Sequence, residues 1–377
     1  MSHEQIAPAN RSFLKAPQHT LPEIVQQPLL WPVTLEMVRS ASLQMQLDSK
    51  LRDARVLLTG AGTSAYAASA VAAAWPRAVA VPTTDLLVDT ERYLIDVNAV
   101  ISVARSGDSP ESAAVVERVR ALRPDILQLA IVCDEDGALS RSSLDGLIVL
   151  DPRTNDRSLV MTSAFSNLVL AGLVLAQPNA TGAIVDEFSK RASSLLPDID
   201  RACQDAAARI RDRIVVLSSS PLTGWRHEGG LKTLEMTAGQ FPLLVETYLG
   251  LRHGPMSFVT PDTLVLCLLS SDTVRRSYEA DLIRELRAKK IGYLVGIADH
   301  GESEGLIDQL IPPVAPHIDD ALRTPFEILG PQLLGYHLSL RIGMNPDNPS
   351  PDGVINRVVS GVRIYPPQHC ETVASKG

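Results

Sequence analysis

Three titratable side chains in the segment Trp225–Gly239 have the spacing of a single helix face. Glu228, Lys232 and Glu235 stand at positions i, i+4 and i+7, which a period of 3.6 residues per turn brings into line. Two carboxylates beside an amine can move protons to and from a bound molecule. The same spacing is also typical of solvent-exposed ion pairs, each worth roughly a few tenths of a kcal/mol. On spacing alone, we favour exposed ion pairs.

A histidine follows in the sequence L-R-H-G-P. His253 stands in a Gly-Pro turn, where a packed loop histidine without a chemical role is the more common case. The pair His227-Glu228 does not continue into the zinc motif H-E-x-x-H, because position 231 is leucine. We therefore expect no metal site on this helix.

Two serine-rich loops each follow an apolar segment in the first half of the chain. They read G-A-G-T-S and R-S-G-D-S-P-E-S, and their candidate ligands are Thr63, Ser64, Arg105, Ser106 and Ser109. Hydroxyls, backbone N–H groups and a helix N-terminus suit a phosphate dianion, to which an arginine adds a charge-assisted bond. The alternative is that Ser64 and Ser109 only cap helices. Two such loops in one domain favour phosphate binding, and the lack of G-K-[ST] argues against a nucleoside triphosphate.

Parallel sheets have to position these residues. Continuous apolar strands alternate with helices, which indicates an α/β fold with helices on both faces of each sheet. Strands predicted at 55–59, 99–104 and 126–132 have counterparts about 160 residues later. These counterparts lie at 213–217, 263–269 and 291–299. The sequence thus predicts a duplicated α/β domain, with ligands beyond the carboxyl ends of the strands.

We divide the chain into three parts. Residues 1–50 are expected to form an N-terminal arm that prolines break before a helix over 34–51. The first α/β domain covers 51–195 and carries the serine-rich loops. The second domain covers 196–377 and carries the helix of Glu235 and a C-terminal tail.

Composition excludes several classes of partner. The chain has 377 residues, 45% of them hydrophobic, and a net charge of −8, which argues against nucleic acid or an anionic membrane as the main partner. The apolar run 159–176 contains polar residues and is expected to be a buried helix. The N-terminus lacks the features of a signal peptide, and the four cysteines are far apart, so we expect a cytoplasmic protein without disulfides.

The motifs together resemble the sugar isomerase (SIS) domains of phosphosugar enzymes. Beyond G-A-G-T-S and R-S-G-D-S-P-E-S, they include E-G-G-L-K-T-L-E and R-H-G-P. The segments H-T-L-P-E-I-V-Q-Q-P-L-L-W, Y-L-G-L-R-H-G-P-M-S-F and P-D-N-P-S-P-D-G-V-I-N-R-V-V-S-G-V extend the resemblance over nearly the whole chain, to the AgaS-type galactosamine-6-phosphate deaminase/isomerases. The resemblance implies two tandem SIS domains, each a flavodoxin-like αβα sandwich of three layers.

The resemblance also implies roles for the candidate residues. Thr63, Ser64, Ser106 and Ser109 would hold the sugar phosphate with Arg105 beside them, and Thr162 would line the sugar site. Glu235 would carry a proton between C1 and C2, with Lys232 and Glu228 as its neighbours. His253 would open the sugar ring from an adjoining subunit. A homodimer or a dimer of dimers is therefore expected.

Two positions depart from the family pattern. Ala104 replaces the first serine of an S-x-S loop, so phosphate contacts are expected to shift toward Arg105. Val359 stands where the related glucosamine-6-phosphate synthase has a lysine that assists ring opening. Asn356 and Arg357 are the candidates to substitute for it.

The expected reaction is deamination of galactosamine 6-phosphate to tagatose 6-phosphate and ammonia, without a metal or redox cofactor. No glutaminase domain precedes the first strand, so this chain is not expected to produce ammonia from glutamine. Two alternatives use the same scaffold: plain ketose/aldose isomerisation and deamination of glucosamine 6-phosphate. A module that senses phosphosugars without turnover is disfavoured, because Glu235, Lys232 and His253 are all present.

Overall fold

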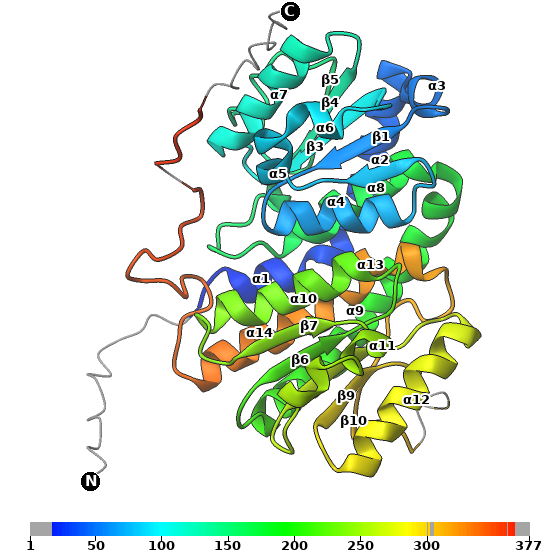
Figure 1. Ribbon diagram of the computed structural model, residues 1–377, viewed down its shortest axis with the longest axis vertical. Coiled ribbons are helices and arrows are strands. Elements are labelled where there is room, and N and C mark those ends of the chain that lie inside the picture. Colours follow the sequence, from blue (N-terminus) through cyan, green and yellow to red (C-terminus); the bar gives the residue numbers. More distant parts are fainter. Residues whose placement is uncertain (1–16, 300, 302–304, 360, 366–377) are drawn as a thin grey trace, which may run out of the picture.

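Two parallel five-stranded sheets form the frame of the molecule (Figure 1). The computed structural model describes residues 17–299, 301, 305–359 and 361–365. In spatial order, the first sheet consists of β2 (Ala78–Ala80), β1 (Val56–Thr59), β3 (Ala99–Ala104), β4 (Leu127–Val132) and β5 (Gly146–Val149). The second consists of β7 (Leu243–Glu246), β6 (Ile214–Leu217), β8 (Leu264–Leu268), β9 (Tyr293–Ile297) and β10 (Gln309–Ile311).

The two sheets have the same topology. When β6 to β10 are taken as counterparts of β1 to β5, the strand orders are identical, and every neighbouring pair is parallel. The predicted α/β class with two tandem domains is confirmed. The central strands β1, β3 and β8 are buried throughout, as their continuous apolar sequences predict. The short edge strands β2, β7 and β10 were not predicted, because they are only partly buried and do not stand out as continuous core segments.

Helices cover both faces of each sheet. Those of the first half are α3 (Leu47–Leu51), α4 (Thr63–Ala73), α5 (Thr83–Val88), α6 (Thr90–Tyr93), α7 (Pro110–Leu122), η1 (Pro152–Thr154) and α8 (Ser163–Ala176). Those of the second half are α10 (Thr223–Met236), α11 (Tyr248–Leu251), η2 (Pro255–Phe258), α12 (Thr273–Lys289), α13 (Asp320–Glu327) and α14 (Leu329–Arg341). Helix α8 is buried from Ser163 to Leu175, as expected. Within the described residues, no helix is long and apolar enough to cross a membrane.

The N-terminal arm is helical earlier than the sequence suggested. Helices α1 (Thr20–Val25) and α2 (Gln27–Met45) run through the prolines that were expected to break them. Pro28 is harmless in the first turn of α2, where the N–H has no helical partner. Pro32 leaves the carbonyl of Pro28 without its usual donor, and the hydroxyl of Ser189 donates to that carbonyl at 2.6 Å instead. The prediction of a broken arm was therefore wrong.

A helix of 32 residues, α9 (Pro178–Arg209), connects the two halves. The proposed domain boundary at 195/196 falls inside this helix, and the division into domains stays a prediction. Helix α9 packs against α2 and α14, and α4 of the first half packs against α10 of the second. One core cluster runs from Leu58 through Leu168 to Val216. The two halves therefore share a continuous core.

Candidate active site

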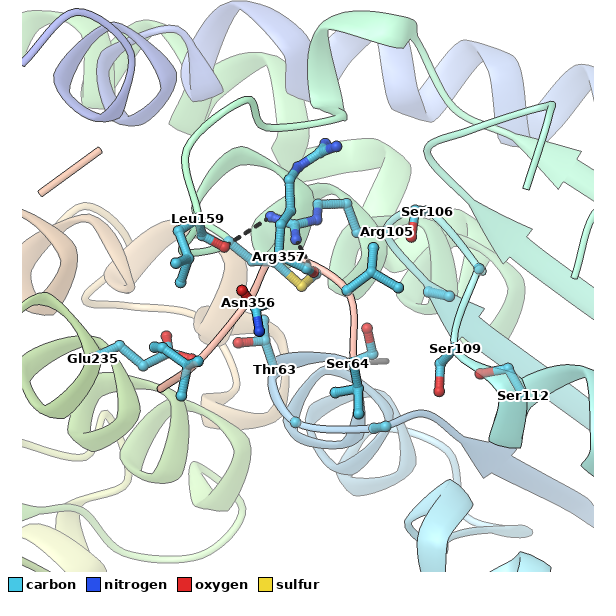
Figure 2. A pocket seen from close by; sticks show the side chains of 18 of the residues that line it. Thr63, Ser64, Arg105, Ser106, Ser109, Ser112, Leu159, Glu235, Asn356 and Arg357 are labelled. Atoms are coloured by element: carbon cyan, nitrogen blue, oxygen red, sulfur yellow. Dashed lines mark hydrogen bonds between the residues drawn. The ribbon is translucent and has the colours of Figure 1, made fainter. Parts of the chain in front are cut away.

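A cavity of about 450 Å³ lies beyond the carboxyl ends of β1 and β3. Its volume is in the range of small-molecule sites. Five parts of the chain form its walls, as Figure 2 shows. They are the loop 61–64, the segment 103–112, the pair Leu159 and Met161, Glu235 of α10, and the tail residues 354–359.

Helix α10 reaches this cavity because it packs closely on α4. A Cβ atom on Gly224 would lie 2.6 Å from the carbonyl oxygen of Tyr66, so only glycine permits the approach. The N-terminus of α10 stays at the carboxyl end of β6, where a ligand was expected. Its C-terminal half brings Glu235 to the cavity of the other domain. The site thus combines residues of both halves of the chain.

The acid–amine–acid face of α10 is buried. Glu228 and Lys232 have no exposed side-chain surface, whereas 23% of the Glu235 side chain is exposed. The Lys232 Nζ atom lies 2.7 Å from Glu235 Oε2 and 3.3 Å from Glu228 Oε1, and it donates to Thr63 Oγ1 at 3.2 Å. Thr63 Oγ1 lies 3.3 Å from Glu228 Oε1. Exposed ion pairs, which spacing alone favoured, are therefore the wrong interpretation.

Burial changes the protonation of this cluster. Desolvation raises the pKa of Glu228 to about 8 against the opposing effect of Lys232. The same burial disfavours the ammonium form of Lys232, but Glu228 and Glu235 outweigh it and raise the pKa of the lysine. At pH 7 these shifts favour a neutral Glu228 beside a charged Lys232. The Glu228 Oε2 atom has no hydrogen-bond partner among the described residues, and a neutral carboxyl tolerates this better than a carboxylate does.

The serine hydroxyls at the other end of the cavity are not helix caps. Gly62, with φ of +57°, holds the N-cap position of α4, so Ser64 lies inside the first turn. Ser109 is the N-cap residue of α7, but its hydroxyl donates to Glu111 rather than accepting from the helix. The N-termini of α4 and α7 both face the cavity, where their partial positive charge favours an anion. Ser64, Ser106 and Ser109 are thus brought together as predicted.

Arg105 lines the cavity but does not point its guanidinium toward these serines (Figure 2). Its Nη1 donates to the carbonyls of Ser158 and Leu159 at 3.2 and 3.1 Å, and its Nη2 donates to the carbonyl of Arg357 at 2.7 Å. Burial, and then the charge of Arg357, lower the pKa of Arg105. The expected shift of phosphate contacts to this guanidinium has no support in the structure, because a buried guanidinium needs acceptors and finds them in the backbone.

The tail brings Asn356, Arg357 and Val359 to the cavity wall. The Asn356 amide points toward the space between Thr63 and Glu235 (Figure 2). The Arg357 side chain turns away and donates to Asn155 Oδ1 at 2.6 Å and to the carbonyl of Asp156. Asn356 is therefore the better placed of the two candidates to contact a ligand.

Two predicted residues lie elsewhere. Thr162 is fully buried, and its N–H and hydroxyl both donate to Asp156, so Leu159 and Met161 line the cavity in its place. His253 is exposed between α11 and η2, beyond the carboxyl end of β7. Because α10 runs back along its sheet, Glu235 lies near the opposite end of that sheet. One chain does not bring His253 to its own cavity.

Several cavity residues were not predicted. Ser112 stands in the first turn of α7, three positions after Ser109, and its place in the serine-rich motif could have identified it. Leu159, Met161 and Val354 carry no signal in the sequence, because an apolar side chain beside a ligand looks like any core residue.

Known proteins resemble the chain over nearly its whole length, although no protein-family model matches it. A D-galactosamine-6-phosphate deaminase AgaS of Shewanella sp. (strain ANA-3) is 35% identical over 92% of this chain and 92% of its own. The protein of that name from Escherichia coli is 34% identical over 91% and 94%. A solved tagatose-6-phosphate ketose/aldose isomerase from Escherichia coli is 30% identical and has a TM-score of 0.80. The match covers 93% of this chain and 96% of the isomerase.

These matches cover 91–93% of the chain, which is more than either half alone. The chain belongs to the AgaS family of sugar isomerase (SIS) enzymes.

Proposed function

We propose that the chain converts D-galactosamine 6-phosphate to D-tagatose 6-phosphate and ammonia. One observation carries the proposal: a buried acid–amine–acid cluster is exposed only at Glu235, at one end of a cavity whose other end suits an anion. The relatives of 34–35% identity that are named D-galactosamine-6-phosphate deaminase support this substrate.

The phosphate would bind at the N-termini of α4 and α7. Ser64, Ser106, Ser109 and Ser112 supply hydroxyls there. A sugar held at its 6-phosphate extends across the cavity, so that C1 and C2 approach the opposite wall and Glu235. Binding energy at the phosphate thus aligns the reacting carbons with the base, which is how remote contacts assist catalysis.

Glu235 would act on the open-chain amino aldose. Its carboxylate removes the proton from C2 while O1 takes a proton from solvent, which gives the enolamine. It then returns the proton to C1, and the nitrogen loses a proton to solvent, which gives a ketimine at C2. Water hydrolyses the ketimine to the ketose and ammonia. Lys232, 2.7 Å from Glu235, would stabilise negative charge that develops on oxygen, while Thr63 and Glu228 hold the ammonium group in place.

A second subunit would supply the ring-opening histidine. His253 is exposed and remote from the cavity of its own chain, which supports a homodimer, or a dimer of dimers, with shared sites. Mixing inactive Glu235→Gln and His253→Ala chains tests this proposal. Subunit exchange should restore sites that combine an intact Glu235 with an intact His253, and a mixture without activity would contradict sharing. We keep the cytoplasm as the proposed location, because the four cysteines lie far apart in the sequence and do not indicate a disulfide framework.

Ammonia release is the direct test of the reaction. The purified chain should release ammonia from galactosamine 6-phosphate faster than from glucosamine 6-phosphate, with equimolar formation of ketose. Binding of both sugars without turnover would contradict the proposal and favour a sensing role.

A ketose/aldose isomerase is the second candidate, because the solved isomerase from Escherichia coli is 30% identical. The same Glu235 would then move the proton between C1 and C2 of a sugar without an amine. Conversion of tagatose 6-phosphate to its aldose, with no ammonia released from any hexosamine 6-phosphate, would identify this reaction.

A further inference from the structure

We propose that Arg105 is a positioning residue that fixes the C-terminal tail as one wall of the cavity. The tail is defined here as residues 345–359. The importance of the cavity rests on the proposed function, whereas the role of Arg105 rests on hydrogen bonds that exist without a ligand.

The Arg105 guanidinium joins three separate segments. It extends from the loop after β3 and donates to Ser158 and Leu159, in the loop before α8, and to the carbonyl of Arg357 in the tail. The side chain is buried, with 6% of the residue exposed. A buried guanidinium with carbonyl acceptors is held firmly, because withdrawing any acceptor leaves a charged donor unsatisfied.

Arg357 makes the reciprocal connection. While its carbonyl accepts from Arg105, its side chain donates to Asn155 Oδ1 at 2.6 Å and through Nε to the carbonyl of Asp156 at 3.1 Å. Arg105 of the first domain thus donates to the tail, and Arg357 of the tail donates to the first domain. The tail is covalently part of the second half, so these bonds also connect the halves across the cavity.

A second anchor lies ten residues earlier in the tail, at Asp347. Its carboxylate accepts from the N–H and hydroxyl of Thr20, at the start of α1, at 2.9 and 2.8 Å. Its carbonyl accepts from the N–H of Leu159 at 3.0 Å. The N-terminal arm and the loop before α8 therefore hold the tail at Asp347, and Arg105 holds it at Arg357. We call the segment 347–357 between these two anchors the strap.

The strap between these anchors carries Ile355 and Asn356 across the cavity. Figure 2 shows the Asn356 amide near Glu235 and Thr63, next to Arg357, whose carbonyl accepts from Arg105. Loss of the clamp would release this wall but leave the serines and the helix N-termini intact. Sugar phosphate affinity and inorganic phosphate affinity should therefore respond differently.

Arg105→Gln tests the inference with two readouts. We expect KM for galactosamine 6-phosphate to rise about tenfold, while the Kd for inorganic phosphate stays within about threefold of wild type. Trypsin should cleave after Arg357 about tenfold faster than in wild type. Arg120→Gln is the matched control and should change neither readout. It loses a partly exposed pair with Asp145 and two long hydrogen bonds to the carbonyls of Pro124 and Ser143, all remote from the tail.

The opposite pattern would overturn the inference: phosphate affinity lost more than tenfold, with tail cleavage at the wild-type rate, makes Arg105 a phosphate ligand. If Arg105→Gln does not fold, Asn155→Ala decides, because it removes one acceptor of the Arg357 side chain and leaves only the carbonyl of Asp156. An unchanged cleavage rate in that variant also rejects the clamp. Phosphate binding and proteolysis require no turnover, so a wrong assignment of the reaction would leave both results readable.

Discussion

The carboxyl edges of the two sheets have the same strand order and similar serine-rich loops but different occupants. We call the ends of β1 and β3, with residues 60–64 and 105–112, the first edge. The ends of β6 and β8, with residues 218–222 and 269–272, form the second edge. The first edge opens into the cavity. The second edge is filled by carboxylates of its own helices.

Two buried acids hold the second edge. Glu279 of α12 accepts from the Ser219 hydroxyl at 2.6 Å and the Ser270 N–H at 2.8 Å. Asp320 of α13 accepts from the Ser270 hydroxyl, the Ser271 N–H and Arg323. Burial opposes the charge of Asp320, but hydrogen bonds from these loops and from Arg323 lower its pKa. Donors that would suit a bound anion are thus already satisfied by the protein.

The first edge keeps two serine hydroxyls for a ligand. The hydroxyls of Ser64 and Ser112 face the cavity and form no hydrogen bond with another described residue. Glu111 of α7 accepts from the Ser109 hydroxyl at this edge, whereas Glu235 reaches the cavity from α10, which belongs to the second half. Identical topology therefore does not give equivalent sites. At the second edge, Glu279 and Asp320 bind the serine loops directly. At the first edge, Glu235 stands on the opposite wall and leaves space for a ligand.

The largest expected effect concerns the acid that faces the first edge. Glu235→Gln should lower kcat for ammonia release by about 10²–10⁴-fold, the usual contribution of a positioned base, with KM within about threefold of wild type. Steady-state kinetics on galactosamine 6-phosphate measure both. Glu117→Gln, on the exposed side of α7, is the control. Wild-type rates in Glu235→Gln would contradict the proposal that the reaction takes place at the first edge.

Removal of an acid from the second edge should affect stability instead. Asp320→Ala removes the closer of the two carboxylates that pair with buried Arg323, at 3.0 Å, and leaves only Glu327 at 3.4 Å. It should lower the unfolding free energy by about 3–5 kcal/mol. Denaturant unfolding measures this, and kcat per folded molecule should be unchanged at low temperature. Asp281→Ala, which breaks an exposed pair with Arg284, should cost less than about 1 kcal/mol. Weaker sugar binding without lost stability would make the second edge a ligand site.

A matched pair of serine variants compares the edges directly. Ser64→Ala should raise KM for the sugar phosphate about 10-fold or more, because a hydrogen bond to a charged group is worth about 1.5–3 kcal/mol. Ser219→Ala should leave KM unchanged and lower stability by about 1–3 kcal/mol, since Glu279 loses a donor. Equal changes of KM in the two variants would refute the distinction.

The smallest effect is a difference in pH dependence. Burial raises the pKa of Glu228 to about 8 and that of Glu279 to about 7, from 4.5. The folded state then binds more protons than the unfolded state above pH 4.5, so stability falls as pH rises toward these values. When the pH is raised from 7 to 8, the unfolding free energy should fall by about 1 kcal/mol less in Glu228→Gln than in wild type. For Glu279→Gln, the smaller fall in unfolding free energy relative to wild type should occur below pH 7. Coinciding curves for wild type and both variants would contradict these protonation states.

Local patterns predicted much of this molecule. Apolar strands such as Ala99–Ala104 identified the parallel sheets, because buried central strands have an unbroken apolar sequence. The order of Glu228, Lys232 and Glu235 on one face followed from helix geometry. The serine loops indicated an anion site, since hydroxyls after parallel strands gather at one edge.

Other features depend on contacts that no local pattern contains. Pro32 continues a helix because Ser189, in a distant segment, satisfies the freed carbonyl. Arg105 was predicted to bind phosphate, whereas its acceptors come from residues 53 to 252 positions away. Thr162 was expected in the cavity wall, but it donates to Asp156. A side chain chooses among partners only once the chain is folded.

The sequence by itself therefore determined the class of fold, the chemical groups and the face of α10 on which they stand. Only the tertiary structure decided that this face is buried against Thr63, which turns an ordinary salt-bridge spacing into a desolvated acid–amine–acid cluster. It also decided which of two similar edges is open, through the carboxylates of Glu279 and Asp320. The physical reason is that desolvation and pairing depend on neighbours in space, whereas spacing in the chain specifies only neighbours on the same element.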